Sequence, residues 1–413
     1  MQQLSLFDGE PTAKPSVELS ALYEAYFDCR RNKRNTRNAL AFEVDYEANL
    51  IALQAEINDG SYQPGKSIAF IVNKPVKREI FAADFRDRVV HHLIIKKLTP
   101  LFEKTFIHDS YACRLGKGTQ LGVRRVDRFI RQCSRNYSQD CYVLKLDIKG
   151  FFMHINKIIL LAELNQFIEC KYNNSDKIIL LELCQKIIHY NPTRNCIIKS
   201  KRSEWHGLPP DKSLFHSTNN CGLPIGNLTS QVFANFYLNP FDHFIKHDLG
   251  IRYYGRYVDD FLIVHQDKTY LKSLIPLIKS TLQERLGLAL HPDKIYLQHY
   301  TKGVEFLGSI IKPHRIYIAN RTKGNFHAAI MKQNVIVRES KPNKKQQAAF
   351  LSSMNSYLGI MKHRKSYKLR KKMLFTTLSS WWWNHVYLSG GLAKFVIRAK
   401  SIKSKRGYRS SSN

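Results

Sequence analysis

The sequence lacks the features that mark a membrane or secreted protein. No apolar run approaches the roughly 20 residues that a membrane-spanning helix needs. Residues 1–14 show no basic start followed by an apolar core, so they do not resemble a secretory signal. The 8 cysteines include no Cys-x-x-Cys pair, which argues against a zinc knuckle and a disulfide framework. These absences favour reduced thiols in a cytoplasmic protein without a membrane partner.

Acidic residues are also scarce. The chain holds 65 Lys and Arg against 33 Asp and Glu, a formal net charge of +32. Residues 311–413 contain 23 Lys or Arg and a single acid, Glu339, which leaves +22 in the last quarter. Solubility needs no such bias, whereas binding to nucleic-acid phosphates does. An anionic membrane would require a segregated apolar face, which neither basic run (362–372 and 394–409) clearly shows.

Apolar periodicity divides the chain into expected helices and strands. Helical spacing covers residues 16–30, 42–58, 86–105, 156–189 with a break at 172–176, 229–247, 268–286 and much of the chain from 322. Strand patterns cover 67–72, 78–82, 142–148, 251–264 with a central turn, and 296–318. Residues 190–222 indicate a long loop with a short hairpin at 196–199, and about the last twenty residues indicate flexible chain. Strands mixed with helices, between helical ends, predict an α+β fold.

Two adjacent carboxylates, Asp259 and Asp260, lie between strand-like runs. Strands are depleted in Asp, so the pair marks a tight turn. An isolated pair would most simply be an ordinary Asp-rich turn, but this one has neither Gly nor Asn at its centre. Holding two negative charges together is costly unless a cation lies between them. The turn therefore indicates a metal site.

A third carboxylate, Asp147, ends the apolar run 142–147, just before a turn at Gly150. Alone it is as consistent with a helix N-cap as with a metal ligand. Asp147 and Asp259 are 112 positions apart, which leaves room for two separate strands with a helical connection. Three carboxylates on neighbouring strands could hold two Mg²⁺ ions about 3.5–4 Å apart and catalyse phosphoryl transfer.

Three strings resemble successive motifs of reverse transcriptases in order and spacing. They are Asp-Ile-Lys-Gly-Phe-Phe at 147–152, Gly-Leu-Pro-Ile-Gly-Asn-Leu-Thr-Ser-Gln at 222–231, and Tyr-Val-Asp-Asp at 257–260. Further matches at 78–89, 110–119, 288–294 and 304–308 extend the resemblance over about residues 70–310. The resemblance implies an RNA-directed DNA polymerase of right-hand architecture, in which a palm with an antiparallel sheet lies between fingers and a helical thumb.

The resemblance also implies individual roles. The metal ligands would be Asp147, Asp259 and Asp260, with Ile148 beside them, and they would hold two Mg²⁺ ions with Mn²⁺ as a substitute. The nucleotide-binding set would be Arg78, Arg114, Lys117, Phe152, Ile225, Gly226, Gln231 and Lys294. Phe152 would exclude a 2′-hydroxyl, although the core is the commoner place for Phe. Lys294 would either donate a proton to pyrophosphate or lie on the surface. Nucleic acid would contact Tyr257, Gly308, Lys362, Arg364, Lys365, Lys368, Arg370, Lys371 and Lys372.

The implied domains follow the motifs. They are an N-terminal extension at 1–40, fingers at 41–140, a palm at 141–312 that includes the helices and loop of 156–222, a basic helical thumb at 313–390 and a basic flexible tail at 391–413. Trp381–Trp383 would pack in the thumb core or on a partner rather than stack on bases. We expect no RNase H, endonuclease or protease module after the thumb.

One motif departs from the usual pattern. Many reverse transcriptases have Gln-Gly-x-x-x-Ser-Pro where this chain has Ile225, Gly226, Ser230 and Gln231. The variant resembles the reverse transcriptases of diversity-generating retroelements, which copy a template-repeat RNA into cDNA with errors opposite adenine and work with a small basic accessory variability protein. The alternatives are another prokaryotic reverse transcriptase (a retron, a CRISPR-associated form or an intron maturase) and a non-catalytic RNA-binding factor on a polymerase scaffold.

Overall fold

The computed structural model describes residues 15–31, 36–73 and 76–398, in two compact units that divide after Gln298. The sequence-based boundary between palm and thumb lies later, after residue 312, so the second unit takes in a short hairpin that we assigned to the palm. The expectations for residues 1–14 and 399–413 lie outside the described part of the chain. No helix among the described residues is long and apolar enough to cross a membrane.

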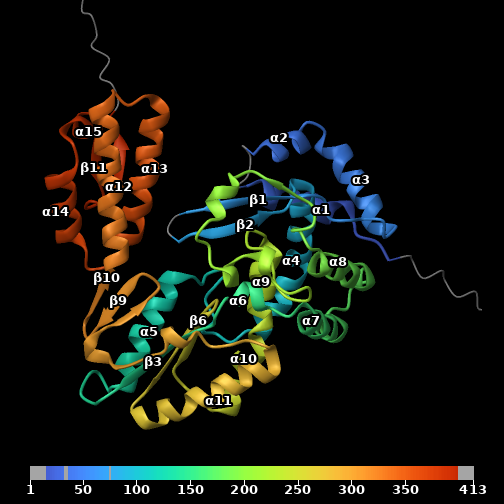
Figure 1. The fold of residues 1–413 in the computed structure, drawn as a ribbon, viewed down its shortest axis with the longest axis horizontal. Coiled ribbons are helices and arrows are strands. Elements are labelled where there is room, and N and C mark those ends of the chain that lie inside the picture. Colours follow the sequence, from blue (N-terminus) through green and yellow to red (C-terminus); the bar gives the residue numbers. More distant parts are fainter. Residues whose placement is uncertain (1–14, 32–35, 74–75, 399–413) are drawn as a thin grey trace, which may run out of the picture. The chain divides into compact units, whose positions relative to one another are not determined.

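A helical layer opens the first unit (Figure 1). It consists of α1 (Leu19–Arg30), α2 (Arg37–Glu43), α3 (Tyr46–Asn58) and α4 (Phe85–Thr105). The stripe of Leu50, Leu53 and Ile57 on α3 is buried, as its spacing predicts. On α4, Asp84 caps the N-terminus by accepting a hydrogen bond from the Arg86 N–H. Helix α4 packs against α1 and also against α9 (Leu228–Tyr237), which comes much later in the sequence.

The first small sheet has three strands in the order β2-β1-β4. Strands β1 (Ser67–Val72) and β2 (Arg78–Ala82) pair antiparallel within the expected bounds. The expected hairpin at 196–199 is wrong: β4 (Cys196–Ile198) is a single strand that pairs parallel with β1. Its partner is more than a hundred residues away, so local pattern could not reveal it. The rest of the 190–222 loop forms 3₁₀ turns η1 (Arg202–Trp205), η2 (Pro210–Lys212) and η3 (Leu214–His216).

A four-stranded sheet carries the predicted carboxylates. Its order is β5-β6-β3-β7, formed by β5 (Tyr254–Tyr257), β6 (Asp260–His265), β3 (Tyr142–Asp147) and β7 (Tyr296–His299). Strands β3, β5 and β6 are rich in Val, Ile, Leu and Tyr, which suit a pleated buried surface. Helix α5 (Thr119–Cys133) packs on β5 and β6, and α11 (Lys268–Leu286) packs on β3 and β6.

The helices between β3 and β5 connect the motifs. The short α6 (Phe151–His154) follows β3, and α7 (Lys157–Lys171) and α8 (Lys177–His189) then pack on each other. The polar break between them lies where it was expected. The helix predicted at 229–247 is divided into α9, α10 (Asn239–His243) and a π-helical turn at Phe244–Asp248, and Pro240 lies in the first turn of α10.

The second unit begins with a meander and continues with helices. Strands β8 (Val304–Phe306), β9 (Ser309–Lys312) and β10 (Arg315–Ile318) form a sheet in the order β10-β9-β8. Helices α12 (Asn320–Glu339), α13 (Lys344–Met361) and α14 (Tyr367–Thr377) lie side by side (Figure 1), with the short α15 (Ser380–His385) after them. Trp382 is fully buried and stacks on Phe350 at a centroid distance of 3.8 Å, so the central tryptophan packs in the core of this unit.

The predicted flexible tail is wrong at its start. Residues Lys394–Ile397 form β12, which pairs antiparallel with β11 (Val386–Ser389). Phe395 is buried against Phe350, and the N–H of Phe395 donates to Oδ1 of Asn355 at 2.7 Å. The basic residues of this segment suggested a flexible chain, but Phe395 packs on α13 and fixes the segment there.

Candidate active site

The catalytic turn joins β5 to β6 through only two residues, Val258 and Asp259, since Tyr257 and Asp260 are paired across it. Such a tight hairpin needs a positive φ, which Gly normally supplies. Here Val258 has φ 57°. A β-branched residue in this region is a backbone outlier that costs about 1–3 kcal/mol. Stored strain of this kind persists where surrounding contacts enforce it, and it is concentrated at functional sites.

Asp147 lies directly opposite Asp260 on the adjacent antiparallel strand. Register partners on neighbouring strands point to the same face of a sheet. The strand end is fixed from both sides, because the N–H of Ile148 donates to the carbonyl of Asp259 at 3.2 Å and the N–H of His291 donates to the carbonyl of Asp147 at 2.8 Å. The sheet therefore places Asp147 beside Asp260, and Asp259 precedes Asp260 in the adjoining turn.

Two lysines pair with two of these three carboxylates. Lys145 Nζ lies 3.2 Å from Oδ2 of Asp260, and Lys294 Nζ donates to Oδ1 of Asp147 at 3.0 Å. Lys145 shares a face with Asp147 because it is two residues earlier on β3. Lys294 is nearly half exposed and arrives from a 3₁₀ turn, Pro292–Lys294, whereas Lys145 is only about a quarter exposed. The sequence indicated Lys294 but not Lys145, since nothing local distinguishes Lys145 from a solvated strand residue.

The pKa values of Asp259 and Asp260 are raised because both acids are buried and lie near other acids. Burial, reinforced by the charge of Asp147, raises the pKa of Asp259 to about 6. Burial also raises the pKa of Asp260 to about 6, although Lys145 opposes this shift. The Arg78 guanidinium acts on Asp259 in the opposite direction and lowers its pKa. A nearby cation would stabilise the ionised form of these buried acids.

The carboxylates fit divalent metal ions. The Oδ1 atom of Asp260 is buried and has no hydrogen-bond partner. An all-carboxylate donor set suits Mg²⁺, which is hard and prefers oxygen. Across residues 15–31, 36–73 and 76–398, no three His, Cys, Asp or Glu side chains converge at ligand distance. Lys145 and Lys294 are paired with two of the three acids, and Asp147, Asp259 and Asp260 are the residues that would hold the ions.

The predicted nucleotide-binding residues of the first unit lie in different surroundings. Phe152 and Ile225 pack against one small apolar cluster, which contains Ala69, Phe81, Met153 and Leu214. The N–H of Phe81 donates to the carbonyl of Ile225 at 2.8 Å. Gly226 has φ 127°, and a Cβ there would lie 2.8 Å from Cγ2 of Ile80. Only glycine permits this close approach of the 222–231 loop to β2.

Arg78 and Gln231 remain available to a ligand. Arg78 begins β2 and its side chain is exposed. Gln231 lies on the first turns of α9, is exposed, and accepts a hydrogen bond at 3.1 Å from the Cys113 thiol. This contact joins the loop of the second fingers motif to α9, which directly follows the loop that carries Ile225.

Arg114 does not match its predicted role. Its side chain is 4% exposed and its guanidinium is bound to Glu103 through Nε and Nη2, at 2.9 and 2.8 Å. Its Nη1 donates to the carbonyls of Ile107 and Ser110. A triphosphate would need these donors free. Arg114 thus shapes the loop, whereas Lys117 is half-buried and donates to the carbonyl of His108 at 3.0 Å.

The predicted nucleic-acid contacts of the second unit also differ among themselves. Most of its basic side chains are exposed, namely Lys362, Lys365, Lys368, Lys371 and Lys372. Arg364 is half-buried and donates to Ser309 Oγ at 2.7 Å. Arg370 is buried and donates to the carbonyl of Leu392 and to Ser366 Oγ, so it is a structural residue and not a phosphate contact. Gly308 turns the β8–β9 hairpin at φ 73°.

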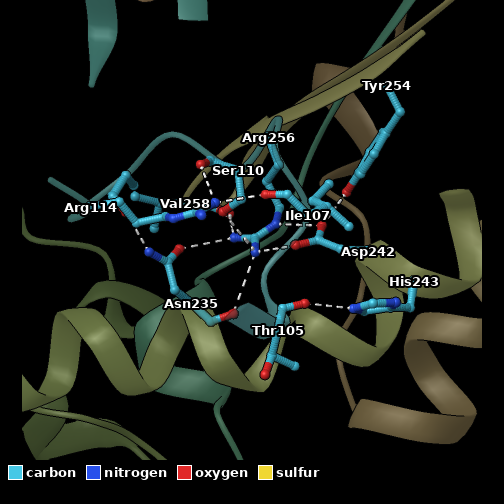
Figure 2. A network of polar contacts seen from close by, with 11 residues as sticks. Thr105, Ile107, Ser110, Arg114, Asn235, Asp242, His243, Tyr254, Arg256 and Val258 are labelled. Carbon is cyan, nitrogen blue, oxygen red and sulfur yellow. Dashed lines mark hydrogen bonds and ion pairs between the residues drawn. The ribbon is translucent and has the colours of Figure 1, made fainter. Parts of the chain in front are cut away.

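A buried polar network below the turn was missed entirely (Figure 2). At its centre Arg256 binds Asp242, and both side chains are fully buried. The sequence gives little indication of this pair. An arginine inside a strand is normally exposed, and the partner of Arg256 lies on a different element, α10. Asp242, in turn, looked like an ordinary helix residue.

Carboxylates at the ends of adjacent antiparallel strands and a strained turn between two of these strands are the features expected of a polymerase palm. The sequence model of the family described as reverse transcriptase (RNA-dependent DNA polymerase) matches residues 73–311, which is more than half of the chain. The chain belongs to the reverse transcriptase family, and its architecture is the right-hand polymerase fold expected from the motifs.

Individual relatives are distant. Protein YkfC of Escherichia coli (strain K12) is 21% identical over 305 residues, which are 66% of this chain and 73% of that protein. Similar solved structures include telomerase from Candida albicans with a fragment of telomeric RNA (TM-score 0.45, 11% identity, 76% of this chain) and apo telomerase from Candida tropicalis (TM-score 0.47, 12% identity, 77% of this chain). The chain covers 55% and 59% of those two telomerase chains.

Proposed function

We propose that this chain is an active RNA-directed DNA polymerase of a diversity-generating retroelement, which copies a template-repeat RNA into cDNA with errors opposite adenine for mutagenic retrohoming into a variable target gene. The observation that carries the subtype is Ile225. Its side chain packs on the same apolar cluster as Phe152. An apolar pocket wall offers no amide hydrogen bonds to orient a nucleotide, so alternative base geometries cost less there than beside a glutamine.

Different residues would bind the metal ions, bind the triphosphate and select the sugar. Mg²⁺ ions bound by Asp147, Asp259 and Asp260 would activate the primer 3′-hydroxyl and neutralise the triphosphate, with Mn²⁺ as a substitute. Arg78 is exposed and its charge lowers the pKa of Asp259, which supports a role in binding the triphosphate. Phe152 lies against the 222–231 loop, whose Leu223 N–H donates to the Phe152 carbonyl at 2.8 Å, and it would exclude a 2′-hydroxyl. Lys294 donates to Oδ1 of Asp147 at 3.0 Å, and a bound ion would compete with it for this carboxylate.

The proposal includes partners and a location. The exposed lysines of the second unit suit the phosphates of template RNA and of the RNA–DNA heteroduplex. The resemblance supports a small basic accessory variability protein as a further partner, and a sequence without a Cys-x-x-Cys pair suits the cytoplasm.

A fidelity assay tests the subtype. Purified enzyme extends a primer over RNA templates that differ in one base, and misincorporation is counted by sequencing. We expect errors to be concentrated opposite adenine, and Ile225→Gln to lower them. Ile197→Gln, at an exposed site on β4, is the matched control and should leave the spectrum unchanged. Equal error rates opposite all four bases, with synthesis intact, would reject the subtype and leave the polymerase assignment standing.

A further inference from the structure

Arg256 has a side chain that is fully buried although it is charged. Its Nε and Nη2 donate to the two carboxylate oxygens of Asp242 at 2.7 and 2.5 Å, which is the bidentate geometry that a guanidinium favours. The Tyr254 hydroxyl donates to the same carboxylate at 2.6 Å. Asp242 lies on α10, so this pair fixes strand β5 to the helix beneath it (Figure 2).

The remaining donor of Arg256 reaches the catalytic turn. Its Nη1 donates to the carbonyl of Val258 at 2.9 Å and to Oδ1 of Asn235 at 3.2 Å. Val258 is the residue whose left-handed backbone closes the two-residue turn. In that conformation its carbonyl faces the guanidinium, so the hydrogen bond opposes relaxation of the strain. Asp259, the next residue, is aimed by the same backbone.

The backbone of Arg256 is bound as well. Its N–H donates to the carbonyl of Asp109 at 2.9 Å, and its carbonyl accepts from the Tyr111 N–H at 2.9 Å. The Asn235 amide donates to the Ala112 carbonyl at 2.5 Å. The network therefore reaches the start of the 110–118 loop, where Arg114 binds the Ser110 carbonyl. One residue connects the catalytic turn, helices α9 and α10, and the second fingers motif.

We propose that Arg256 is a positioning residue for the polymerase reaction. Anchored by Asp242, it enforces the left-handed backbone at Val258 and so aims Asp259 at the site that Asp147 and Asp260 share. It touches neither substrate nor metal ligand side chain, and it acts through the shape of the turn. This role rests on the polymerase function and is independent of the retroelement subtype.

The test needs a control that separates positioning from folding. Asp242→Asn and Arg256→Lys weaken the anchor while they keep its size. The chain offers a matched carboxylate in Asp176, which is likewise buried, paired with Lys97 at 2.6 Å, and hydrogen-bonded by the Tyr172 hydroxyl at 2.7 Å. It lies just before α8, away from the turn. Asp176→Asn should lower the unfolding temperature without changing how the chain binds Mn²⁺.

Mn²⁺ affinity without nucleic acid, followed by electron paramagnetic resonance, is the first readout. Residues behind metal ligands typically change affinity by about 10–100-fold, so Arg256→Lys and Asp242→Asn should weaken Mn²⁺ binding about tenfold and lower kcat with little change in KM. An equal shift in Asp176→Asn would overturn the proposal. If Arg256→Lys does not fold, Asp242→Asn, which retains the arginine, still gives the comparison.

A second substitution addresses the turn directly. Glycine adopts a positive φ without strain, so Val258→Gly no longer needs an enforced turn. The fold-loss in kcat that Arg256→Lys causes should therefore be smaller in a Val258→Gly background than in the natural chain. An equal fold-loss in both backgrounds would overturn the proposal. Absence of synthesis by the unmutated chain would instead contradict the polymerase function, so the two failures are distinguishable.

Discussion

Lys145 on β3 lies with its Nζ 3.2 Å from Oδ2 of Asp260, and no local sequence feature predicts the contact. The Lys145 ammonium forms an ion pair with Asp260, one of the three carboxylates proposed to bind the metal ions. Its positive charge lowers the pKa of Asp260, whereas burial raises it. In the metal-free chain, Lys145 therefore stabilises an acid that would otherwise be held close to other acids without compensation.

Removal of this lysine should improve metal binding. In Lys145→Met, a divalent ion no longer competes with an ammonium for Asp260, and we expect Mn²⁺ affinity to rise about fivefold, or ~1 kcal/mol, as suits a partly exposed ion pair. Titration of the nucleic-acid-free protein by electron paramagnetic resonance measures this. Lys149→Met removes an exposed lysine that forms no ion pair in the described part of the chain, and it should have no effect. Weaker binding in Lys145→Met would show that the lysine assists the ions.

The two arginines of the fingers motifs should respond differently to substitution. Arg114→Met breaks a guanidinium–carboxylate pair with Glu103 and should cost about 2 kcal/mol of folding free energy, with KM for dNTP unchanged once the folded fraction is corrected. Chemical denaturation and steady-state kinetics measure the two quantities.

Arg78→Ala should show the reverse pattern. Its exposed side chain contributes little to folding, but the loss of a charged contact to the triphosphate should raise KM for dNTP about tenfold. If Arg114→Met raised KM and left stability unchanged, the assignment of Arg114 as a structural residue would be wrong.

His91 should make stability depend on pH. It is buried on α4 beside the Thr229 hydroxyl, and burial lowers its pKa to about 3. As the pH falls below about 6.5, the unfolded chain takes up the proton and the folded chain does not, so stability falls by up to about 1.4 kcal/mol per pH unit until the folded pKa is reached.

His91→Gln removes this contribution. Its free energy of unfolding should change less than that of the natural chain between pH 6.5 and 5, as measured by urea denaturation. Parallel curves for the two proteins would show that His91 is charged in the folded state.

Features of the fold that depend on one short segment are predictable from the sequence, whereas those that depend on a distant partner are not. The strands at 67–72 and 142–147, and the helix break near Tyr172, follow from periodicity within one segment and were predicted within a residue or two. Asp147, Asp259 and Asp260 were singled out because a carboxylate at a strand end is unusual in itself. The sheet confirms that β3 and β6 are neighbours, and its register, which the sequence did not predict, places Asp147 opposite Asp260.

The predictions that differ from the structure share one cause. In each case the surroundings of the residue depend on a partner from another part of the chain. Arg114 and Arg370 have the composition of phosphate contacts, but Glu103 and the carbonyl of Leu392 bind them. Strand β4 finds its partner in β1, and Phe395 anchors a segment that its basic neighbours made appear flexible. Arg256 needed Asp242, on another element, to be recognised.

The central claim is that three carboxylates on β3 and β6 and in the turn between β5 and β6 catalyse DNA synthesis on RNA. The most direct measurement is extension of a DNA primer on an RNA template with Mg²⁺, by the unmutated chain and by Asp259→Asn with an unchanged unfolding temperature. We predict that the unmutated chain extends the primer and that the variant loses about a thousandfold or more of the rate. Equal extension by both proteins, or RNA binding without synthesis by the unmutated chain, would contradict the claim.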